Sequence, residues 1–387
     1  MRILQVYDLA PDTTLPTDGV GLAIRGLSGA LVALGHEVWI LAGAGLSAEP
    51  LRTLDGAKFV RIEARNLMRR SWSATTLHWS RQLLFPVVAS CNMRALRQFA
   101  GFDIFHGHIY SGGLVALALG KSLGGKVVNT IHGSYYDIWP SLLPKRTARL
   151  VRHAEKRAAL FLAKHADVQI HTGGYFRETL ERWGADPNKL TTLHNGVDRS
   201  LFDRAMPPRL TPRPVFFTAR RLVKKNGLHI LLAAFEEVAK ELNAELRIAG
   251  EGPELRSLQE QCVNLGIHEQ VTFTGALDRD KLPRFVQDGQ VAVIPSLAEA
   301  SSLFLLECMA LRRPVVCSDV GGLTEVVDKH TAWIARAGDS EDLARKMSAA
   351  VTDWNASVEK ADLARSLAES QFTWDSVAER TLGIYER

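Results

Sequence analysis

Short runs of apolar residues alternate along the chain with longer segments in which apolar side chains recur every three or four positions. This alternation is typical of parallel sheets whose strands are joined by helices. In the first half, the clearest helical patterns cover residues 20–34 and 149–164. The strands predicted for this half are 3–7, 37–41, 59–62, 104–106, 126–131, 168–171 and 190–194.

A stretch with four prolines, residues 199–214, has no periodicity and is predicted to be a linker. A second alternating series begins directly after it. Its predicted strands are 215–218, 245–249, 271–274, 291–294 and 314–318. Its predicted helices are 228–242, 254–265, 279–288 and 303–311, and three more helical segments follow, the last at 374–387.

These two series predict an α/β fold with two doubly wound, Rossmann-like domains, residues 1–198 and 215–373. Open sheets of this type bind ligands beyond the carboxyl ends of their strands. We therefore expect the two domains to face each other across a cleft that holds an active site.

The composition narrows the class of protein further. Hydrophobic residues make up 46% and charged residues 23%, which excludes a mainly disordered, collagen-like or coiled-coil chain. No apolar run approaches the roughly 18 residues of a membrane span. The first residues are predicted to form a strand rather than a secretory leader, so a cytoplasmic protein is expected. The four cysteines are far apart and predict neither a disulfide framework nor a zinc site.

Charge is distributed unequally between the two halves. Residues 1–198 hold 23 basic against 15 acidic residues, and residues 199–387 hold 24 against 27. An excess of positive charge in the first half indicates either an anionic substrate or contact with a membrane surface. Ordinary variation in surface charge remains an alternative.

The segment between residues 295 and 325 carries the strongest candidate chemistry. A loop of small residues follows the predicted strand 291–294, and a helix is predicted to begin near Leu303. A helix start presents unpaired N–H groups and the positive end of the helix dipole, which suit a phosphate. Glu299 lies on the loop, and Glu307 lies in the helix, where an unpaired carboxylate among apolar residues would be costly. Two carboxylates beside such a helix start are better explained as acceptors for sugar hydroxyls than as solvated surface charges.

This segment resembles the signature of the family 4 glycosyltransferases, which are retaining enzymes of the GT-B fold that use nucleotide-sugar donors. The shared pattern is a Pro-Ser pair, two glutamates eight residues apart, a small-residue helix, a Pro-Val-Val strand and a Gly-Gly turn. The resemblance implies that Glu299 binds hydroxyls of the donor sugar and that Glu307 binds the ribose diol. Where the family has Gly-Phe-Gly, the implied backbone contacts to the donor come from Ala300, Ser301, Ser302 and Leu303.

Further motifs follow the family's order along the chain. By resemblance, Arg221 and Lys225 grip the donor diphosphate; Asn226 stands at the usual lysine position, directly after Lys225. Gly19, preceded by Asp18, matches the second glycine of a Gly-Gly pair that approaches the diphosphate. The turns expected to line the nucleotide pocket contain Gly250, Gly252 and Gly275.

The resemblance extends to both ends of the domains. Residues 193–202 resemble the element that closes the first domain, and residues 372–374 resemble the start of the final helix. The resemblance implies that the helix 374–387 packs back onto the first domain.

Two histidines lie at or just beyond the ends of predicted strands in the first half, where side chains face the expected cleft. By resemblance, His132 lies against the donor sugar, and His108 lies near the acceptor. Tyr110, two residues after His108, is predicted to contact the acceptor as well.

Three alternative classes of protein share parts of this pattern. A nicotinamide oxidoreductase needs a Gly-x-Gly-x-x-Gly fingerprint, which neither Gly19 nor Gly250 completes. A metal-dependent transferase would use an Asp-x-Asp site; Asp278 and Asp280 match it by letter, but helix capping explains them better. The third alternative is a protein that binds sugar nucleotides without turnover, which the presence of Glu299 and Glu307 disfavours.

The sequence therefore predicts a retaining hexosyltransferase with His132, Glu299, Arg221 and Lys225 as the candidate catalytic set. It transfers sugar from a UDP- or GDP-linked donor, needs no metal or other cofactor, and acts on a glycan, lipid-linked or small-molecule hydroxyl in polysaccharide or glycoconjugate biosynthesis. No nucleic-acid partner is expected. The basic and aromatic segment 65–81 is interpreted either as a contact with the inner membrane surface or as a helix pair with partly buried tryptophans.

Overall fold

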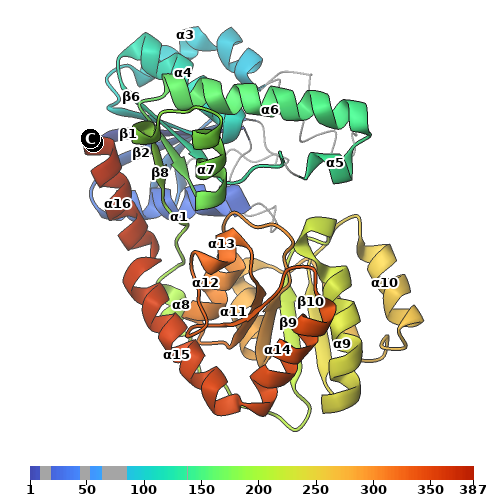
Figure 1. The fold of residues 1–387 in the computed structure, drawn as a ribbon. Coiled ribbons are helices and arrows are strands. Elements are labelled where there is room, and N and C mark those ends of the chain that lie inside the picture. Colours follow the sequence, from blue (N-terminus) through green and yellow to red (C-terminus); the bar gives the residue numbers. More distant parts are fainter. Residues whose placement is uncertain (9–18, 44–52, 63–84, 137) are drawn as a thin grey trace. The chain divides into compact units, whose positions relative to one another are not determined.

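The computed structural model describes residues 1–8, 19–43, 53–62, 85–136 and 138–387. The described chain forms two compact units. The first contains Met1–His194 together with Val377–Arg387, and the second contains Asn195–Ser376. Each unit is built around its own sheet (Figure 1). Asp18 and the segment 65–81 lie outside the described residues.

The sheet of the first unit has eight strands in the order β3-β4-β2-β1-β5-β6-β7-β8. All neighbouring strands are parallel except β3, which pairs antiparallel with β4. The strand order reverses between the neighbouring strands β1 and β5, so the carboxyl ends of these two strands mark a topological switch point. The strands are β1 (Arg2–Tyr7), β2 (Glu37–Gly43), β3 (Thr53–Leu54), β4 (Ala57–Ile62), β5 (Ile104–His108), β6 (Lys126–Ile131), β7 (Val168–His171) and β8 (Leu190–Thr192).

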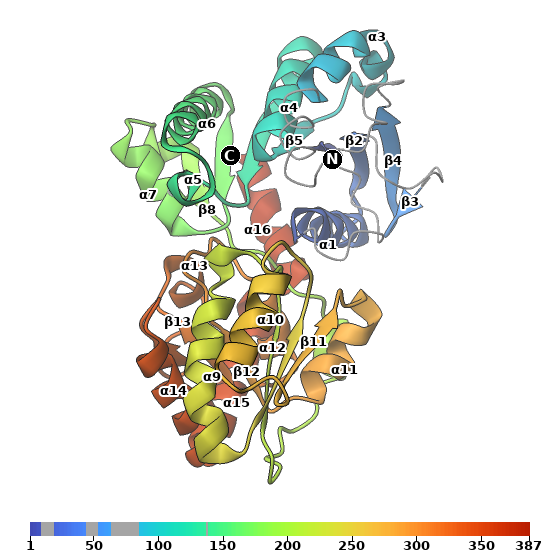
Figure 2. The same ribbon diagram turned by 90° about the vertical axis from the view of Figure 1, so that its right-hand side faces the viewer.

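Helices cover both faces of this sheet. Helix α4 lies on one face beside α6, and α1 lies on the other (Figure 2). The final helix α16 (Trp374–Glu386) begins in the second unit and ends against the first, where the Lys126 ammonium donates to the carbonyls of Ile384 and Tyr385 at 3.2 and 3.0 Å. The other helices of this unit are α1 (Gly19–Ala33), α3 (Met93–Leu96), α4 (Ile109–Leu123), α5 (Trp139–Leu142), α6 (Lys145–His165) and α7 (Gly174–Arg182).

The sheet of the second unit has six parallel strands in the order β11-β10-β9-β12-β13-β14. This is the doubly wound order in which strand four lies beside strand one, so β9 and β12 flank the switch point. The strands are β9 (Val215–Ala219), β10 (Glu245–Ala249), β11 (Val271–Gly275), β12 (Val291–Ile294), β13 (Val315–Ser318) and β14 (Trp333–Ala335).

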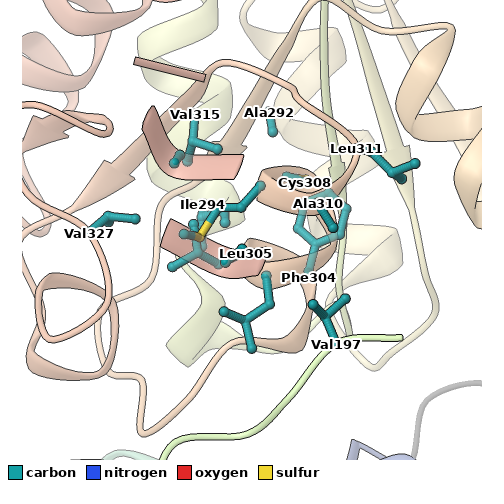
Figure 3. Close-up of a cluster of buried hydrophobic side chains, with 14 of the residues drawn as sticks. Val197, Ala292, Ile294, Phe304, Leu305, Cys308, Ala310, Leu311, Val315 and Val327 are labelled. Atoms are coloured by element: carbon teal, nitrogen blue, oxygen red, sulfur yellow. The ribbon is translucent and has the colours of Figure 1, made fainter. Parts of the chain in front are cut away.

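Alternate side chains of these strands enter two separate cores. One core packs against α11, α12 and α15, and the other against α9, α10 and α14. Figure 3 shows Phe304, Leu305 and Cys308 of α12 among Ile294 and Val315 of the sheet. The main helices of the second unit are α8 (Ser200–Asp203), α9 (Leu228–Leu242), α10 (Leu255–Asn264), α11 (Leu282–Gln287), α12 (Leu303–Ala310), α13 (Gly321–Thr324), α14 (Ser340–Thr352) and α15 (Trp354–Gln371).

The predicted α/β class with two doubly wound sheets is confirmed, and most predicted strands lie within one or two residues of the observed ones. The observed boundaries differ from the predicted ones. The first unit ends at His194 rather than at residue 198, and the whole predicted linker 199–214 belongs to the second unit, in whose core Leu201 and Phe202 of α8 are buried. The described part of the chain contains no helix that is both long and apolar enough to cross a bilayer.

Candidate active site

Residues from two adjacent strand ends meet at the switch point of the second sheet. Arg220 directly follows β9, and Ser296 and Glu299 follow β12. The Arg220 guanidinium donates to Ser296 Oγ at 2.6 Å and pairs with the Glu299 carboxylate. Both members of this ion pair are more than nine-tenths buried. A buried pair is stable only when each charge keeps its partner, so Arg220 fixes the orientation of Glu299.

The loop after Glu299 is fixed at both ends. Ser302 is the N-cap of α12, and its hydroxyl accepts from the backbone N–H of Leu305 at 3.2 Å. Ser301 Oγ accepts from the Asn195 side chain at 3.1 Å. The carbonyl of Glu299 accepts from Gly322 at 3.1 Å, and a Cβ at Gly322 would lie 2.4 Å from that same oxygen. Glycine at position 322 therefore allows the turn to approach the loop.

Glu307 lies one turn further along α12 and is buried. Its carboxylate pairs with Arg279, whose Nη2 lies 2.6 Å from Glu307 Oε1. Burial raises the pKa of Glu307, and the charge and hydrogen bond of Arg279 lower it against that effect. A carboxylate held in this way presents its second oxygen as a strong acceptor for a hydroxyl group.

The basic residues of the β9–α9 turn have different positions. Arg220 is turned toward Glu299, whereas Arg221 and Lys224 are exposed and Lys225 is half-buried. Asn226 stabilises the turn by donating to the Arg221 carbonyl at 2.7 Å. The structure therefore does not bring Arg221 and Glu299 together in one ion pair.

The predicted glycines lie at three further strand or helix ends. Gly250 follows β10 with a φ of 133°, and a Cβ there would lie 1.9 Å from the Arg220 carbonyl. Gly250 N–H donates to the Gly275 carbonyl at 2.7 Å, so the ends of β10 and β11 are joined beside β9. Gly252 packs on the carbonyl of Leu222 in the same turn system. Gly19 is the first residue of α1 in the first unit and is exposed.

Three histidines stack at the switch point of the first sheet. His108 lies between His106 and His132, with ring centroids 4.5 and 5.2 Å apart. His108 Nδ1 lies 2.9 Å from His132 Nε2, and His108 Nε2 lies 2.6 Å from Gln5 Oε1. His106 contacts the hydroxyls of Thr130 and Tyr385 at 2.7 and 2.6 Å.

Burial is the main cause that keeps these imidazoles neutral. It lowers the pKa of His106 to about 3 and that of His132 to about 4. Burial, together with the charges of both neighbouring histidines, holds the pKa of His108 well below its usual range. Each ring therefore has one donor and one acceptor nitrogen at neutral pH. Within the described residues, the buried Nδ1 of His132 makes no hydrogen bond.

Glu155 of α6 holds the loop that follows His132. Its Oε1 accepts from Tyr110 Oη, Ser134 Oγ and the Tyr135 N–H at 3.0, 2.8 and 3.2 Å. Its Oε2 accepts from the Trp139 indole at 2.6 Å. Tyr110, predicted to contact an acceptor, thus has its hydroxyl engaged by a buried carboxylate.

Four residues of these networks were missed by the sequence analysis. The only signals available were the position of Arg220 at a strand end and the presence of Asn195 in a motif. Asp278 was expected to cap a helix, but its side chain makes no capping bond and instead accepts from Lys281 Nζ at 2.6 Å. The missed residues are Glu155, Asn195, Arg220 and Arg279.

The two doubly wound units and the carboxylates at the second switch point define a glycosyltransferase of the GT-B fold class. The chain belongs to the group 1 and family 4 glycosyltransferases. A family model described as "Glycosyltransferase Family 4" matches residues 17–201, and one described as "Glycosyl transferases group 1" matches residues 202–368. The predicted family is thereby confirmed.

Two relatives are similar to this chain along almost their full length. The chain is 25% identical to glycogen synthase of Mycobacterium tuberculosis over 398 residues, covering 100% of this chain and 94% of that protein. It is 26% identical to the MMP alpha-(1->4)-mannosyltransferase of Mycolicibacterium hassiacum over 400 residues, covering 95% and 94%.

Solved structures share the fold. Sucrose-phosphate synthase from Thermosynechococcus elongatus superposes with a TM-score of 0.83 at 19% identity, covering 100% of this chain and 98% of that one. Anabaena HepE, in complex with UDP and glucose, superposes with a TM-score of 0.78 at 17% identity, covering 100% and 99%.

Proposed function

We propose that this chain is a retaining hexosyltransferase that takes a sugar from a nucleoside-diphosphate donor bound by the second unit. The observation that carries the proposal is the convergence of Glu299, the start of α12 and Glu307 at the switch point of a parallel sheet. The relatives named above as a synthase and a mannosyltransferase support a hexosyl donor. The HepE complex with UDP supports a UDP-linked one, and GDP is the other candidate.

In this proposal each residue has a distinct task. Glu307, held by Arg279, accepts hydrogen bonds from the ribose diol, and Glu299, held by Arg220, accepts them from hydroxyls of the sugar. The N–H groups of residues 300–303 bind the donor, with Gly250, Gly252 and Gly275 around the nucleotide. Arg221 and Lys225 bind the diphosphate and stabilise the negative charge that develops as it departs.

The proposed reaction needs no protein nucleophile. The acceptor oxygen bonds to the anomeric carbon on the face from which the diphosphate leaves. The bond between that carbon and the phosphate oxygen breaks, and the acceptor proton passes to the departing diphosphate. His132 would bind the transferred sugar, and His108 would set the orientation of His132 through their shared hydrogen bond. The negative charge of the departing diphosphate is balanced by Arg221, Lys225 and backbone N–H groups, so the proposed reaction requires no metal.

The acceptor is proposed to be a hydroxyl of a glycan, a lipid-linked sugar or a small molecule bound by the first unit. Because the hydroxyl of Tyr110 already donates to Glu155, its proposed contact with an acceptor would use the face of its ring. The segment 65–81, interpreted either as a membrane contact or as a helix pair, lies outside the described residues, so both interpretations remain predictions from the sequence.

Two measurements test the proposal. Purified protein is screened calorimetrically against UDP- and GDP-sugars, and the transfer product of any donor that binds is examined by NMR for its anomeric configuration. A product with the donor's configuration supports the proposal, and an inverted product contradicts it. Tight donor binding with no transfer to any acceptor would favour the alternative of a non-catalytic sugar-nucleotide-binding protein.

A further inference from the structure

Helix α6 presents a basic and apolar face to solvent. Seven exposed residues lie on one side of it, and the side that carries Ala148, Glu155 and Leu162 is buried. Figures 1 and 2 show α6 on the outside of the first unit, next to α4. The exposed residues, called here the outer face of α6, are Arg146, Arg149, Leu150, His153, Arg157, Phe161 and Lys164. Apart from the neighbours Arg149 and Leu150, successive members are three or four positions apart, as one helix face requires.

The cations of this outer face have no carboxylate partners within the described residues. Elsewhere the helices pair their charges at a spacing of four, as in Arg177 with Glu181 at 2.9 Å and Arg256 with Glu260 at 2.9 Å. In α6 the one acidic residue, Glu155, points to the interior and binds the loop after His132.

This arrangement does not stabilise the helix itself. Cations near a helix N-terminus oppose the helix dipole, and like charges four positions apart repel. The first turns of α6 nevertheless contain Lys145, Arg146 and Arg149 and no acidic residue. The charge pattern is therefore better explained by an external anionic partner than by the stability of the fold.

Two large apolar side chains share the outer face. Leu150 is 70% exposed and Phe161 is 46% exposed, and three helical turns separate them. A soluble polyanion would match the cations but would leave these side chains in water. A basic helix with apolar residues on its exposed face is typical of segments that lie in the interface of an anionic bilayer.

We infer that the outer face of α6 binds the surface of a membrane that contains anionic lipids. The cations contact lipid phosphates, and Leu150 and Phe161 enter the boundary between headgroups and acyl chains. This inference does not depend on the proposed transferase reaction, because it concerns only an exposed surface of the first unit.

The experiment is co-sedimentation of the full chain with phosphatidylcholine vesicles, prepared with and without phosphatidylglycerol. We expect binding only to the anionic vesicles and a decrease as salt is added. Each cation near an anionic surface contributes about 1 kcal/mol, or about fivefold in partitioning. Arg149→Gln with Arg157→Gln should therefore weaken partitioning by about 25-fold.

The apolar pair and a matched control complete the design. Leu150→Ser with Phe161→Ser should weaken vesicle binding by about tenfold or more and leave retention on immobilised heparin unchanged. The control, Arg256→Gln with Arg284→Gln in the second unit, makes the same change in net charge and should bind vesicles as the native chain does. Nucleotide binding, followed by calorimetry, should be unchanged in all three double variants.

Three outcomes would overturn the inference. The first is equal binding to neutral and anionic vesicles. The second is full vesicle binding by the Leu150 and Phe161 variant, which would identify a soluble polyanion as the partner. The third is an equal loss in the control variant, which would show that only net charge matters. Circular dichroism and thermal unfolding of each variant verify that the chain remains folded.

Discussion

The Arg220 guanidinium and the Glu299 carboxylate form a buried ion pair at the switch point of the second sheet. The neighbouring residue, Arg221, is exposed and stands outside this pair. Two consecutive arginines thus have different environments, because successive side chains at a strand end point in opposite directions. If Glu299 binds the donor sugar, Arg220 acts through it as a positioning residue, and Arg221 remains available to the diphosphate.

Substitutions of the two arginines should therefore have different effects on nucleotide affinity and turnover. Arg221→Met should weaken affinity for free nucleoside diphosphate by about ten- to a hundredfold, since hydrogen bonds between charged groups contribute roughly 1.5–3 kcal/mol. Arg220→Met leaves Glu299 buried without its partner, so it should lower turnover and stability and leave nucleoside-diphosphate affinity nearly unchanged. Arg220→Lys should recover part of the turnover. Calorimetry and initial rates separate the two; equal loss of nucleotide affinity in both variants would contradict the assignment.

The regular elements could be predicted because apolar periodicity is a local property of the sequence. The strands 126–131, 245–249 and 291–294 have the predicted ends. Helix α4 was not predicted, since its run is rich in glycine. These glycines allow α4 to approach the sheet: a Cβ at Gly112 would lie 2.3 Å from the Val6 carbonyl. Such a contact between residues more than a hundred positions apart leaves no periodic signal.

The candidate site could be predicted only in part for the same reason. Glu299 and Glu307 have a fixed spacing in one segment, and the motif locates both. Their partners come from other strands: Arg220 lies 79 residues before Glu299. The partner of Glu307, Arg279, follows the end of β11, and only the folded sheet brings it to α12. In the sequence, Glu155 is one charged residue of a basic helix, and only the folded structure shows that it binds the loop after His132.

The two glutamates can be distinguished by changing each to its amide. Glu307→Gln should lower affinity for nucleoside diphosphate by about ten- to a hundredfold, because the ribose diol loses a charged acceptor. Glu299→Gln should leave that affinity nearly unchanged and depress turnover, because its proposed partner is the transferred sugar. Loss of nucleotide affinity in Glu299→Gln but not in Glu307→Gln would show that the proposed roles are reversed.

Substitution of Arg279 tests how its ion pair with Glu307 affects that carboxyl group. Arg279→Ala removes the cation that lowers the pKa of this buried carboxyl. The pKa should then rise further, so nucleotide affinity should weaken progressively as pH falls from neutral, and more steeply than in the native chain. A pH profile identical to that of the native chain would mean that Arg279 does not influence Glu307 in solution.

Transfer should continue in the presence of a chelator. In the proposed site, the charge of the leaving diphosphate is balanced by Arg221, Lys225 and the N–H groups at the start of α12. Initial rates are measured after dialysis against EDTA, and then with Mg²⁺ or Mn²⁺ added. Full loss of activity that either ion restores would contradict a metal-independent mechanism.

Glu155 should act on turnover through the loop that follows His132. In Glu155→Gln, the amide oxygen can replace Oε1, but the amide nitrogen then faces the Trp139 indole donor. Turnover should fall while affinity for nucleoside diphosphate stays constant. Adding Trp139→Phe removes the opposing donor, so the double variant should be more active than Glu155→Gln alone. Ser357→Ala, which removes the acceptor of the Trp333 indole at 2.9 Å in the second unit, is the control for loss of a buried indole bond.

Acidification should destabilise the first unit over a defined range of pH. Burial lowers the pKa of His171 to about 3, with Arg177 adding to the effect, and lowers that of His132 to about 4. The unfolded chain binds protons at these histidines from a pH near 6.5 downward, whereas the folded chain remains neutral there. The contribution of these neutral histidines to the free energy of unfolding is therefore fully present above pH 6.5 and decreases as the pH falls toward 4. Each such histidine contributes a slope that approaches about 1.4 kcal/mol per pH unit.

His171 offers the clearest test of this slope, because neither of its ring nitrogens makes a hydrogen bond within the described residues. His171→Leu should reduce the dependence of the unfolding free energy on pH between 6 and 4 by about 1.4 kcal/mol per unit. The measurement is urea unfolding at several pH values, with β7 followed by hydrogen-exchange mass spectrometry. Phe176→Leu, which alters the ring packed against His171, should lower stability equally at every pH. If His171→Leu retains the native slope, this histidine is already protonated in the folded protein, and its burial does not keep it neutral.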